Sequence, residues 1–293
     1  MFRLAKAELF KLSKNRTFKV LCVVAICLSI VIFIMTTSVF DKLIEKATMG
    51  MSQEEAQSML DLGTSGSNKE QVVTPGGLGV HLNAKDPFNP TVLEVFSSSF
   101  GEGIIEVLIG ILIAAFLAKE YSEGTIKNIL AYGKNRSEFY LSKFIAIVVA
   151  IIVILFCLIL IPTIGSFIVN GWGEPFKTSQ LVRMIVSFFL AVISNASVAA
   201  LLMIIAISVK SNGGTIGITV GIFVLFPSII SFIYGLNKVF DKIYEMTPYY
   251  NNKVAISLYA SNGDLIKSLI VSLITIIISL FVGIQIFKKQ DVK

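Results

Sequence analysis

Residue types that support catalysis are scarce in this sequence of 293 residues. His81 is the only histidine, so a zinc site with two imidazole ligands is excluded. The three cysteines, Cys22, Cys27 and Cys157, lie inside apolar runs, which indicates packing rather than a disulfide framework or a metal site. We therefore expect a chain that is not an enzyme.

Two stretches have some features of a phosphate-binding loop, but neither fits the full pattern. That pattern, Gly-x-x-x-x-Gly-Lys-[Ser/Thr], holds phosphates with backbone amides and a lysine. The stretch GTSGSNKE at residues 63–70 does not match it, and Gly133-Lys134 has Asn128 where the leading glycine should stand. We expect the chain to bind no cofactor of its own and to hydrolyse no nucleotide by itself.

The elements that must position any functional residue are membrane helices. The chain is 55% hydrophobic and only 15% charged, and its mean hydropathy is +0.81. A soluble domain needs more charges to cover its surface. The continuous apolar runs predict an all-α membrane protein with six transmembrane helices. We place these spans at residues 18–40, 104–118, 144–169, 184–209, 215–234 and 265–287.

The distribution of basic residues predicts the orientation of the chain. Fifteen of the 25 Lys and Arg residues lie in the N-terminal segment, the 119–143 connection, position 210 and the C-terminal tail. Connections rich in Lys and Arg stay in the cytosol. We therefore expect a multi-pass protein of the plasma membrane, with both termini and the 119–143 connection in the cytosol.

The two longest outer connections differ in character. Residues 41–103 carry nine acidic residues against four lysines, and a helical pattern there is followed by turn residues. We expect an extracellular loop domain. Residues 235–264 mix tyrosines with isolated charges, which is typical of a segment at the membrane interface.

Few polar groups lie within the predicted spans, and Glu106 is the one carboxylate among them. Ser194, Asn195 and Ser197 could line a pathway, or could form the ordinary hydrogen bonds between membrane helices. Pro227 could bend a span for function, or could be one of the prolines that such helices tolerate. The scarcity of buried charge favours a large amphipathic or lipid-like solute over a metal ion or a proton.

The stretch KEYSEGTIKNILAYGKNRSEFYLSKF resembles the cytosolic connection of type 2 ABC exporter permeases. Their pattern is a Glu, a Gly-Thr pair, a Leu, and then a basic turn before a Lys that enters the third span. The matching positions are Glu120, Glu123, Gly124, Thr125, Leu130, Arg136 and Lys143. The resemblance covers the whole chain, including the six spans and the cytosolic termini.

This resemblance implies a permease subunit without an ATPase of its own. Its partners would be a cytosolic ABC ATP-binding subunit, which holds ATP and Mg, a second permease copy, and membrane lipid, but no nucleic acid. Residues 1–17 would form an amphipathic connecting helix at the inner membrane surface. Residues 119–143 would contain the coupling helix, and residues 235–264 would form re-entrant outer helices.

The residue types in the 119–143 connection suit a docking role. Apolar anchors for a partner groove would come from Tyr121, Ile126 and Leu130. A charged rim would come from Glu120, Glu123 and Arg136, with Gly124 and Thr125 between them. The alternative is a solvated loop that only joins two spans, but such a connector needs far fewer residues.

The long outer loop departs from many permeases of this family. It resembles the subgroup in Gram-positive peptide-antibiotic export and immunity, and its acidic character would attract a cationic peptide. The leading hypothesis is outward export of an amphipathic peptide, antibiotic or lipid-like solute. The alternative is a non-transporting sensor or scaffold that binds extracellular peptide, and an ion channel is disfavoured because no filter signature is present.

Overall fold

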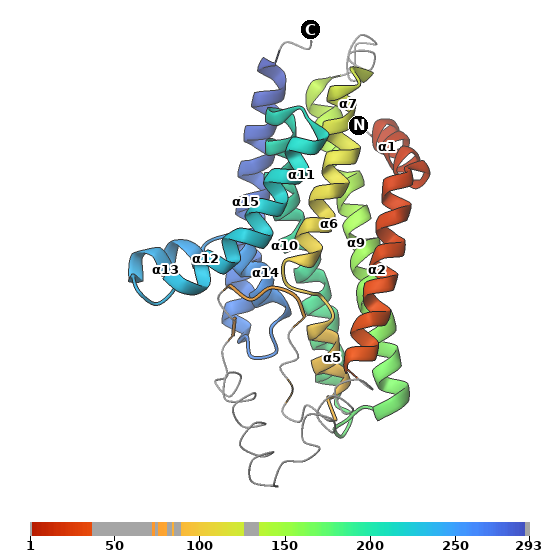
Figure 1. The fold of residues 1–293 in the computed structure, drawn as a ribbon, viewed down its shortest axis with the longest axis vertical. Helices are drawn as coiled ribbons and strands as arrows, with labels where there is room; N and C mark the ends of the chain where they lie inside the picture. Colours follow the sequence, from red (N-terminus) through yellow and green to blue (C-terminus); the bar gives the residue numbers. More distant parts are fainter. Residues whose placement is uncertain are drawn as a thin grey trace, which may run out of the picture.

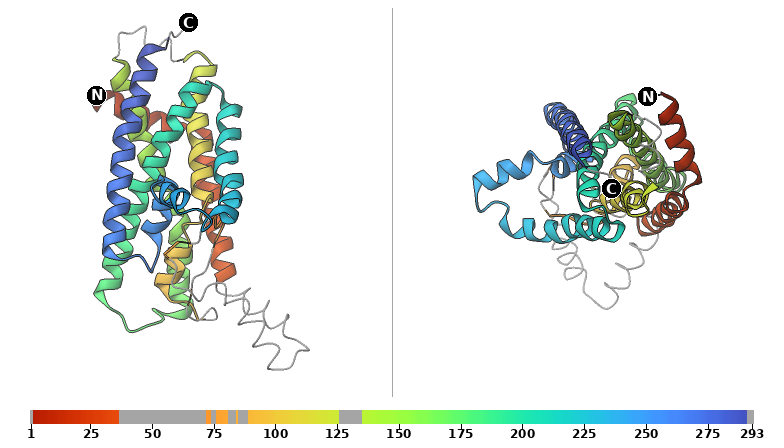
Figure 2. Two further views of the ribbon diagram at one scale, coloured as in Figure 1. Left: turned by 90° about the vertical axis from the view of Figure 1, so that its left-hand side faces the viewer. Right: turned by 90° about the horizontal axis from the view of Figure 1, so that it is seen from above.

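The structure is a computed structural model that describes residues 2–36, 72–73, 76–80, 84, 89–125 and 135–290. Its long helices form an elongated bundle (Figures 1 and 2). The predicted all-α class is confirmed, since the described residues contain no strand. In chain order the elements are α1 (Phe2–Lys14), α2 (Arg16–Ile34), α5 (Val92–Ser98), α6 (Ile104–Ile113), the π-helical turn η2 (Ala114–Ala118), α7 (Lys119–Ser122), α9 (Arg136–Asn170), α10 (Thr178–Val209), α11 (Asn212–Val220), the π-helical turn η3 (Gly221–Leu225), α12 (Phe226–Ile233), α13 (Lys238–Glu245), α14 (Pro248–Ile256) and α15 (Asn262–Lys289).

Five helices of the described chain are long and apolar enough to cross a membrane. They are α2, α9, α10, the continuous helix Asn212–Ile233 and α15. The expected second span, residues 104–118, is covered by α6 and η2, which have 10 and 5 residues. These two elements continue without a break into α7, so that one helix runs from residue 104 to 122. It is as long as α2, but it carries Glu106, Lys119 and Glu120 and so lacks the apolar composition of the other five.

Several helices begin before the predicted spans. The helix α9 starts at Arg136 rather than at residue 144, because the Asn135 side chain caps it by accepting a hydrogen bond from the backbone N–H of Ser137 at 3.0 Å. The helix α10 starts at Thr178 rather than at residue 184. The end of the 119–143 connection is therefore the first part of a long helix, which carries Lys143 into the bundle.

The helix α10 is the most enclosed of the five long helices. It contacts α6, α9, α11, α14 and α15. Small residues on α10, among them Ala191, Ala199 and Ala206, are fully buried. Small side chains allow membrane helices to approach one another closely.

The packing of α6 against α11 also requires a close approach of the two helices. A Cβ atom at Gly110 would overlap the side chain of Thr219. We expect G110A to destabilise the protein by about 1–3 kcal/mol, the usual cost of overpacking. A Cβ at Gly217, also on α11, meets only open space among the described residues, so G217A is the matched control. Thermal unfolding in detergent measures the midpoint of each variant. Equal midpoints for G110A and G217A would contradict this packing.

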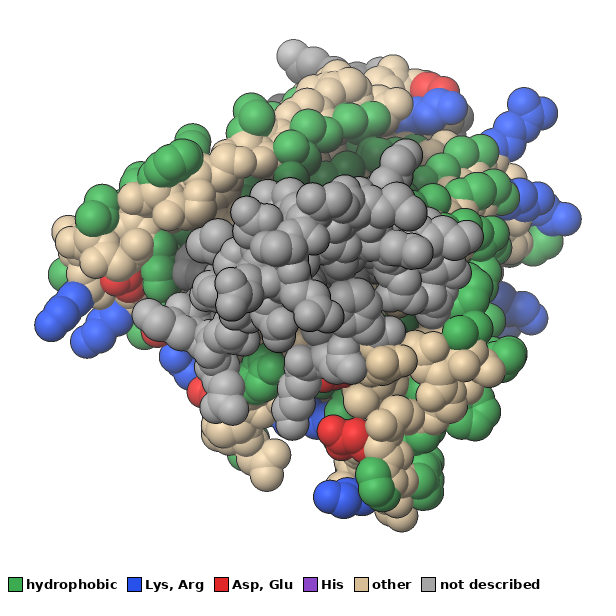
Figure 3. Space-filling view, turned by 60° about the horizontal axis from the view of Figure 1, so that its bottom comes forward, with side chains coloured by type: hydrophobic (Ala, Val, Ile, Leu, Met, Phe, Trp, Pro, Cys, Tyr) green, Lys and Arg blue, Asp and Glu red, His purple; other side chains and the backbone are tan. Residues whose placement is uncertain are grey.

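The bundle has two distinct ends. Both termini and α7 lie at one end, and α5 lies at the other (Figure 1). Between them, α12 and α13 form a short arm at the side of the bundle, and α14 returns to pack against α10 and α15 (Figures 1 and 2). The helix α13 exposes Val239 and Ile243, and Met246, which follows its last residue, is exposed as well. Seen towards the α5 end, the flanks of the bundle also expose hydrophobic side chains (Figure 3).

Candidate functional site

The densest group of buried charges lies at the end of the bundle that carries both termini. Lys143 of α9 is fully buried. Its ammonium nitrogen lies 2.7 Å from a carboxylate oxygen of Glu8 in α1 and 2.7 Å from one of Glu120 in α7. It also donates a hydrogen bond to the backbone carbonyl of Phe116 in η2, at 3.1 Å. The ammonium therefore donates two hydrogen bonds, to Glu120 and Phe116, and forms an ion pair with Glu8, so that one side chain joins three helices.

A second lysine completes this group. The Lys11 ammonium lies 2.9 Å from Glu8 and 3.6 Å from Glu120. Burial lowers the pKa of Lys11. Its hydrogen bond to Glu8 and the charge of Glu120 together raise the pKa by more than burial lowers it, so the pKa lies above its ordinary value. We call Glu8, Lys11, Glu120 and Lys143 the charge cluster. Its two carboxylates and two ammonium groups balance, and loss of one partner would leave a buried charge uncompensated.

The base of the 119–143 connection is attached to the bundle by aromatic side chains as well. The ring of Tyr121 meets the ring of Phe287 edge-on, with centroids 6.1 Å apart, and Phe139 stacks on Phe287 at 5.8 Å. Burial raises the pKa of the Tyr121 hydroxyl. The end of α15 is thus packed against both ends of the connection.

The Arg136 side chain binds backbone carbonyl groups at the same end of α15. One guanidinium nitrogen donates to the carbonyl oxygens of Phe287 at 3.2 Å, Lys288 at 2.9 Å and Gln290 at 2.7 Å. The last carbonyl groups of a helix lack partners within the helix, so a cation there satisfies them and opposes the helix dipole. Arg136 is therefore a capping residue for α15 in this structure.

The tip of the described connection is exposed. Glu123 and Lys119 form a surface ion pair at 3.5 Å, each 54% exposed. Gly124 has a left-handed backbone with φ of 68°, and the Thr125 hydroxyl donates to the carbonyl of Glu120 at 3.2 Å. Ile126 and Leu130, two of the predicted anchors, lie outside the described residues. The predicted coupling residues thus divide into a half-buried base, Glu120, Tyr121 and Arg136, and an exposed tip.

Sequence reasoning missed Glu8 as a member of this site. The residue is 1% exposed although it lies in a segment expected at the membrane surface. A signal was present, because Glu8 is the only acidic residue among the first 40, where six basic residues surround it. A lone carboxylate in a basic amphipathic helix indicates a cationic partner inside the bundle.

A second polar group lies deeper in the bundle. Glu106 of α6 is 1% exposed, and its Oε1 accepts a hydrogen bond from the side-chain amide of Asn252 in α14 at 2.8 Å. The Asn195 amide of α10 donates to the side-chain oxygen of Asn252 at 2.9 Å and to the Ala191 carbonyl at 2.9 Å. Glu106 is therefore held by an amide pair that bridges α6, α10 and α14.

Comparison with known families decides what kind of protein this bundle is. The family model described as ABC-2 family transporter protein matches residues 3–292, almost the whole chain. The chain belongs to the ABC-2 transporter family. A search of curated proteins finds no match. The ABC-2 permease is the membrane component of an ABC transporter, and permeases of this family normally act with a cytosolic ATP-binding subunit.

Family membership and the five long apolar helices together make this ABC-2 permease a multi-pass membrane protein. A permease of this family is a transport component rather than a catalytic enzyme. The predicted pathway residues lie at different places in it. Ser194 lies 3.0 Å from Ser272 of α15, hydroxyl to hydroxyl, and the Ser197 hydroxyl donates to the Ser194 carbonyl at 2.6 Å. Both serines are therefore occupied by contacts within the bundle.

Pro227 has a different environment in the permease. It lines an apolar groove of about 390 Å³ between α10, η3, α12 and α14, together with Phe223, Phe226 and Tyr249. No charged side chain lines this groove among the described residues. Tyr249 meets Phe223 at a tilt, with ring centroids 5.6 Å apart, and lies one helical turn from Asn252 on α14.

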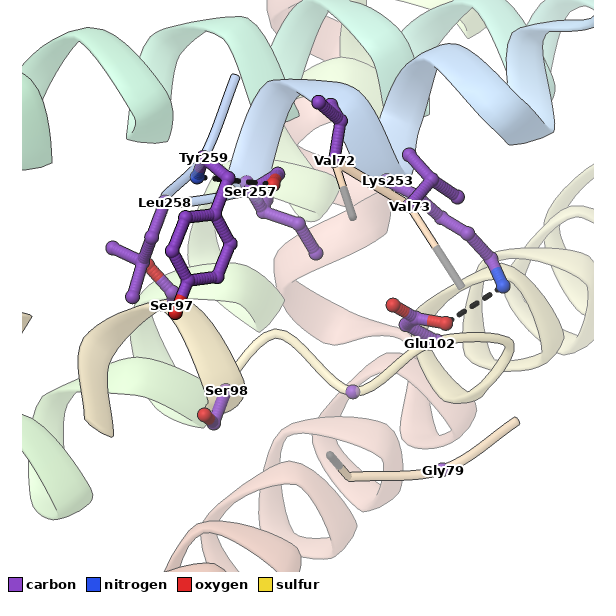
Figure 4. A pocket seen from close by; sticks show the side chains of 12 residues that line it. Val72, Val73, Gly79, Ser97, Ser98, Glu102, Lys253, Ser257, Leu258 and Tyr259 are labelled. Carbon is purple, nitrogen blue, oxygen red and sulfur yellow. Dashed lines mark hydrogen bonds and ion pairs between the residues drawn. The ribbon is translucent and has the colours of Figure 1, made fainter. Parts of the chain in front are cut away.

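The described part of the 41–103 segment is attached to α14 by Lys253. The buried Lys253 ammonium lies 2.7 Å from Glu102 and donates to the Gly77 carbonyl at 2.7 Å. This ion pair borders a small cavity of about 40 Å³, which Ser98 and Tyr259 also line (Figure 4). Residues 41–70 of the predicted loop domain lie outside the described residues.

The amide pair makes a testable contribution to stability. We expect N252L to destabilise the permease by about 1–3 kcal/mol, because the Glu106 carboxyl loses the donor to its Oε1 while it stays buried. The double variant E106M/N252L removes both polar groups and should recover most of the loss. Thermal unfolding in detergent compares the two. A double variant no more stable than N252L would show that the loss comes from packing rather than from an unpaired carboxyl.

Proposed function

We propose that this ABC-2 permease exports an amphipathic solute outward, using ATP hydrolysed by a separate cytosolic subunit. ATP and Mg²⁺ are held by that subunit, which docks on the 119–143 connection. The observation that carries the proposal is the charge cluster. It joins the base of this connection, through Glu120, to both α1 and α9.

A displacement of the 119–143 connection would reach the helices of the bundle through few contacts. The exposed tip at Glu123 and Gly124 continues directly into α7, and Glu120 of α7 is paired with Lys143 of α9. Lys143 is paired in turn with Glu8, so α1 moves with α9. Buried charges that form ion pairs resist separation. We infer that α1, α7 and α9 move as one body when the ATP-binding subunit changes shape.

The proposed topology has six spans and cytosolic termini. In it, α6 and η2 form a short second span whose continuation, α7, begins the cytosolic connection. Support comes from the grouping of basic residues at the end with both termini, where Lys11, Lys14, Arg16, Lys119 and Lys288 lie on α1, α2, α7 and α15. A second copy of the permease completes the proposed transporter, in line with the family resemblance.

The proposed solute has a large apolar part. The groove at Pro227 is about 390 Å³ and has an apolar lining, so it suits a hydrocarbon or a nonpolar peptide side chain better than a hydrated ion. The acidic composition of residues 41–103 favours a cationic partner on the outer side. We therefore propose a cationic amphipathic peptide as the first substrate to test.

Reconstitution of the permease with its ATP-binding subunit in proteoliposomes tests this function. We expect a cationic amphipathic peptide to stimulate ATP hydrolysis, and the same peptide with glutamine at its basic positions to stimulate it less. Potassium chloride alone should have no effect. A permease that binds no ATP-binding subunit, but still binds the peptide, would instead support the non-transporting sensor.

A further inference from the structure

A basic hollow opens at the end of the bundle that carries both termini. It lies between the end of α1, the start of α2 and α7, and has a volume of about 460 Å³. Four cationic side chains line it: Lys11, Lys14, Arg16 and Lys119. Glu120 and Glu123 also line it, so the hollow carries an excess of two positive charges.

The excess charge belongs to two particular residues. Lys11 is paired with Glu8 and Glu120, and Lys119 is paired with Glu123. Lys14 and Arg16 are exposed, and no carboxylate of the described residues lies within ion-pair distance of them. The first turn of α2 holds no acidic residue either, so the positive end of that helix dipole adds to the same field. An anion would compensate both residues.

Below the basic residues the surface is apolar. Arg16 begins α2, and Val20, Val23 and Val31 continue its face along the helix with exposures of 59%, 59% and 50%. These spacings keep the residues on one side of an α-helix. At the hollow itself Phe10 is 64% exposed, and Ala115 and Phe116 form part of the lining. A ligand that fits this surface has an anionic head and a hydrocarbon body.

We propose that this hollow binds the phosphate headgroup of an anionic phospholipid, with its acyl chains along the exposed face of α2. The assignment to the inner leaflet depends on the proposed orientation, whereas the lipid chemistry does not. Each Lys or Arg near a membrane surface strengthens the attraction of anionic lipid, and basic pockets between helices on the cytosolic side bind such headgroups. A protein partner would match the charges, but it would leave the apolar stripe below Arg16 without a counterpart.

The test is a titration of the purified full-length permease in detergent with dioctanoyl phosphatidylglycerol, followed by thermal unfolding. We expect K14Q/R16Q to raise the apparent Kd for this lipid by about tenfold or more. The control K288Q/K289Q removes two lysines of α15 at the same end of the bundle and should leave the Kd unchanged. Dioctanoyl phosphatidylcholine should stabilise all three proteins equally and weakly, and excess inorganic phosphate should not displace the phosphatidylglycerol.

Three results would overturn this site. One is an unchanged Kd in K14Q/R16Q, and another is an equal rise in K288Q/K289Q, which would indicate a diffuse field rather than a pocket. The third is displacement by inorganic phosphate, which would make the hollow a site for free anions. If K14Q/R16Q keeps its lipid affinity but loses the ATP-binding subunit, the hollow is a protein-docking surface. Failure of the export function would leave the lipid titration unaffected, so the two proposals can be judged separately.

Discussion

K143M is expected to destabilise the permease by about 3–5 kcal/mol. The substitution removes the cation that pairs with Glu8 and Glu120 while the Glu8 carboxylate stays 1% exposed. Thermal unfolding of the purified permease in detergent measures the loss. The control is K267M, which breaks a surface contact of 3.8 Å between Lys267 and Glu245, with side chains 52% and 32% exposed. An exposed pair of this kind contributes about 1 kcal/mol or less.

The double variant E8Q/K143M distinguishes the effect of an unpaired buried charge from the effect of lost packing. Both buried charges are then absent, so the variant should regain most of the stability that K143M loses. An E8Q/K143M protein as unstable as K143M would mean that Lys143 acts through packing, for example against the Phe116 ring, whose centroid lies 3.9 Å from the ammonium. Equal stability of K143M and K267M would contradict the charge cluster itself.

E123K/G124A is expected to reduce copurification of the ATP-binding subunit by at least tenfold, which corresponds to about 1.4 kcal/mol. Both residues lie at the exposed tip of the described connection. The Glu123 ion pair is a surface pair of small energy, and alanine at the left-handed Gly124 costs about 1–2 kcal/mol. The permease should therefore still fold, and its lost binding would report on the docking surface.

The other end of the bundle offers a matched control for this variant. Gly171 also has a positive φ, of 65°, and open space at its Cβ position among the described residues. Glu174, three residues later, is exposed. G171A/E174K thus makes the same two chemical changes far from the connection and should leave copurification unchanged. Equal loss in both variants would indicate general damage to the permease rather than a docking site.

Much of the fold could be predicted because apolar runs specify membrane helices directly. The runs around α2, α9, α10 and α15 each gave a helix that is long enough to cross a membrane. Helix ends were less predictable, since caps such as Asn135 act locally and extend a helix beyond its apolar run. The run at residues 104–118 also gave a helix, α6 with η2, but hydropathy alone could not show that Glu106 within it is buried.

The candidate site was harder to predict, because its members come from distant parts of the sequence. Glu8 and Lys143 meet only because α1 folds back against α9. Lys143 could be taken from its position for a residue at the membrane boundary, yet it is fully buried. Asn195 was a pathway candidate by its location in α10, but its partner Asn252 lies in a segment expected at the interface. Only the packing of α14 against α10 brings them together.

Hydrogen exchange of the permease with and without its ATP-binding subunit tests the central claim most directly. The claim is that the 119–143 connection receives the force derived from ATP. We predict that backbone amides of residues 119–125 exchange more slowly when the subunit is bound, while those of residues 171–177 at the other end do not change. Bound subunit with unchanged exchange in residues 119–125 would contradict the claim.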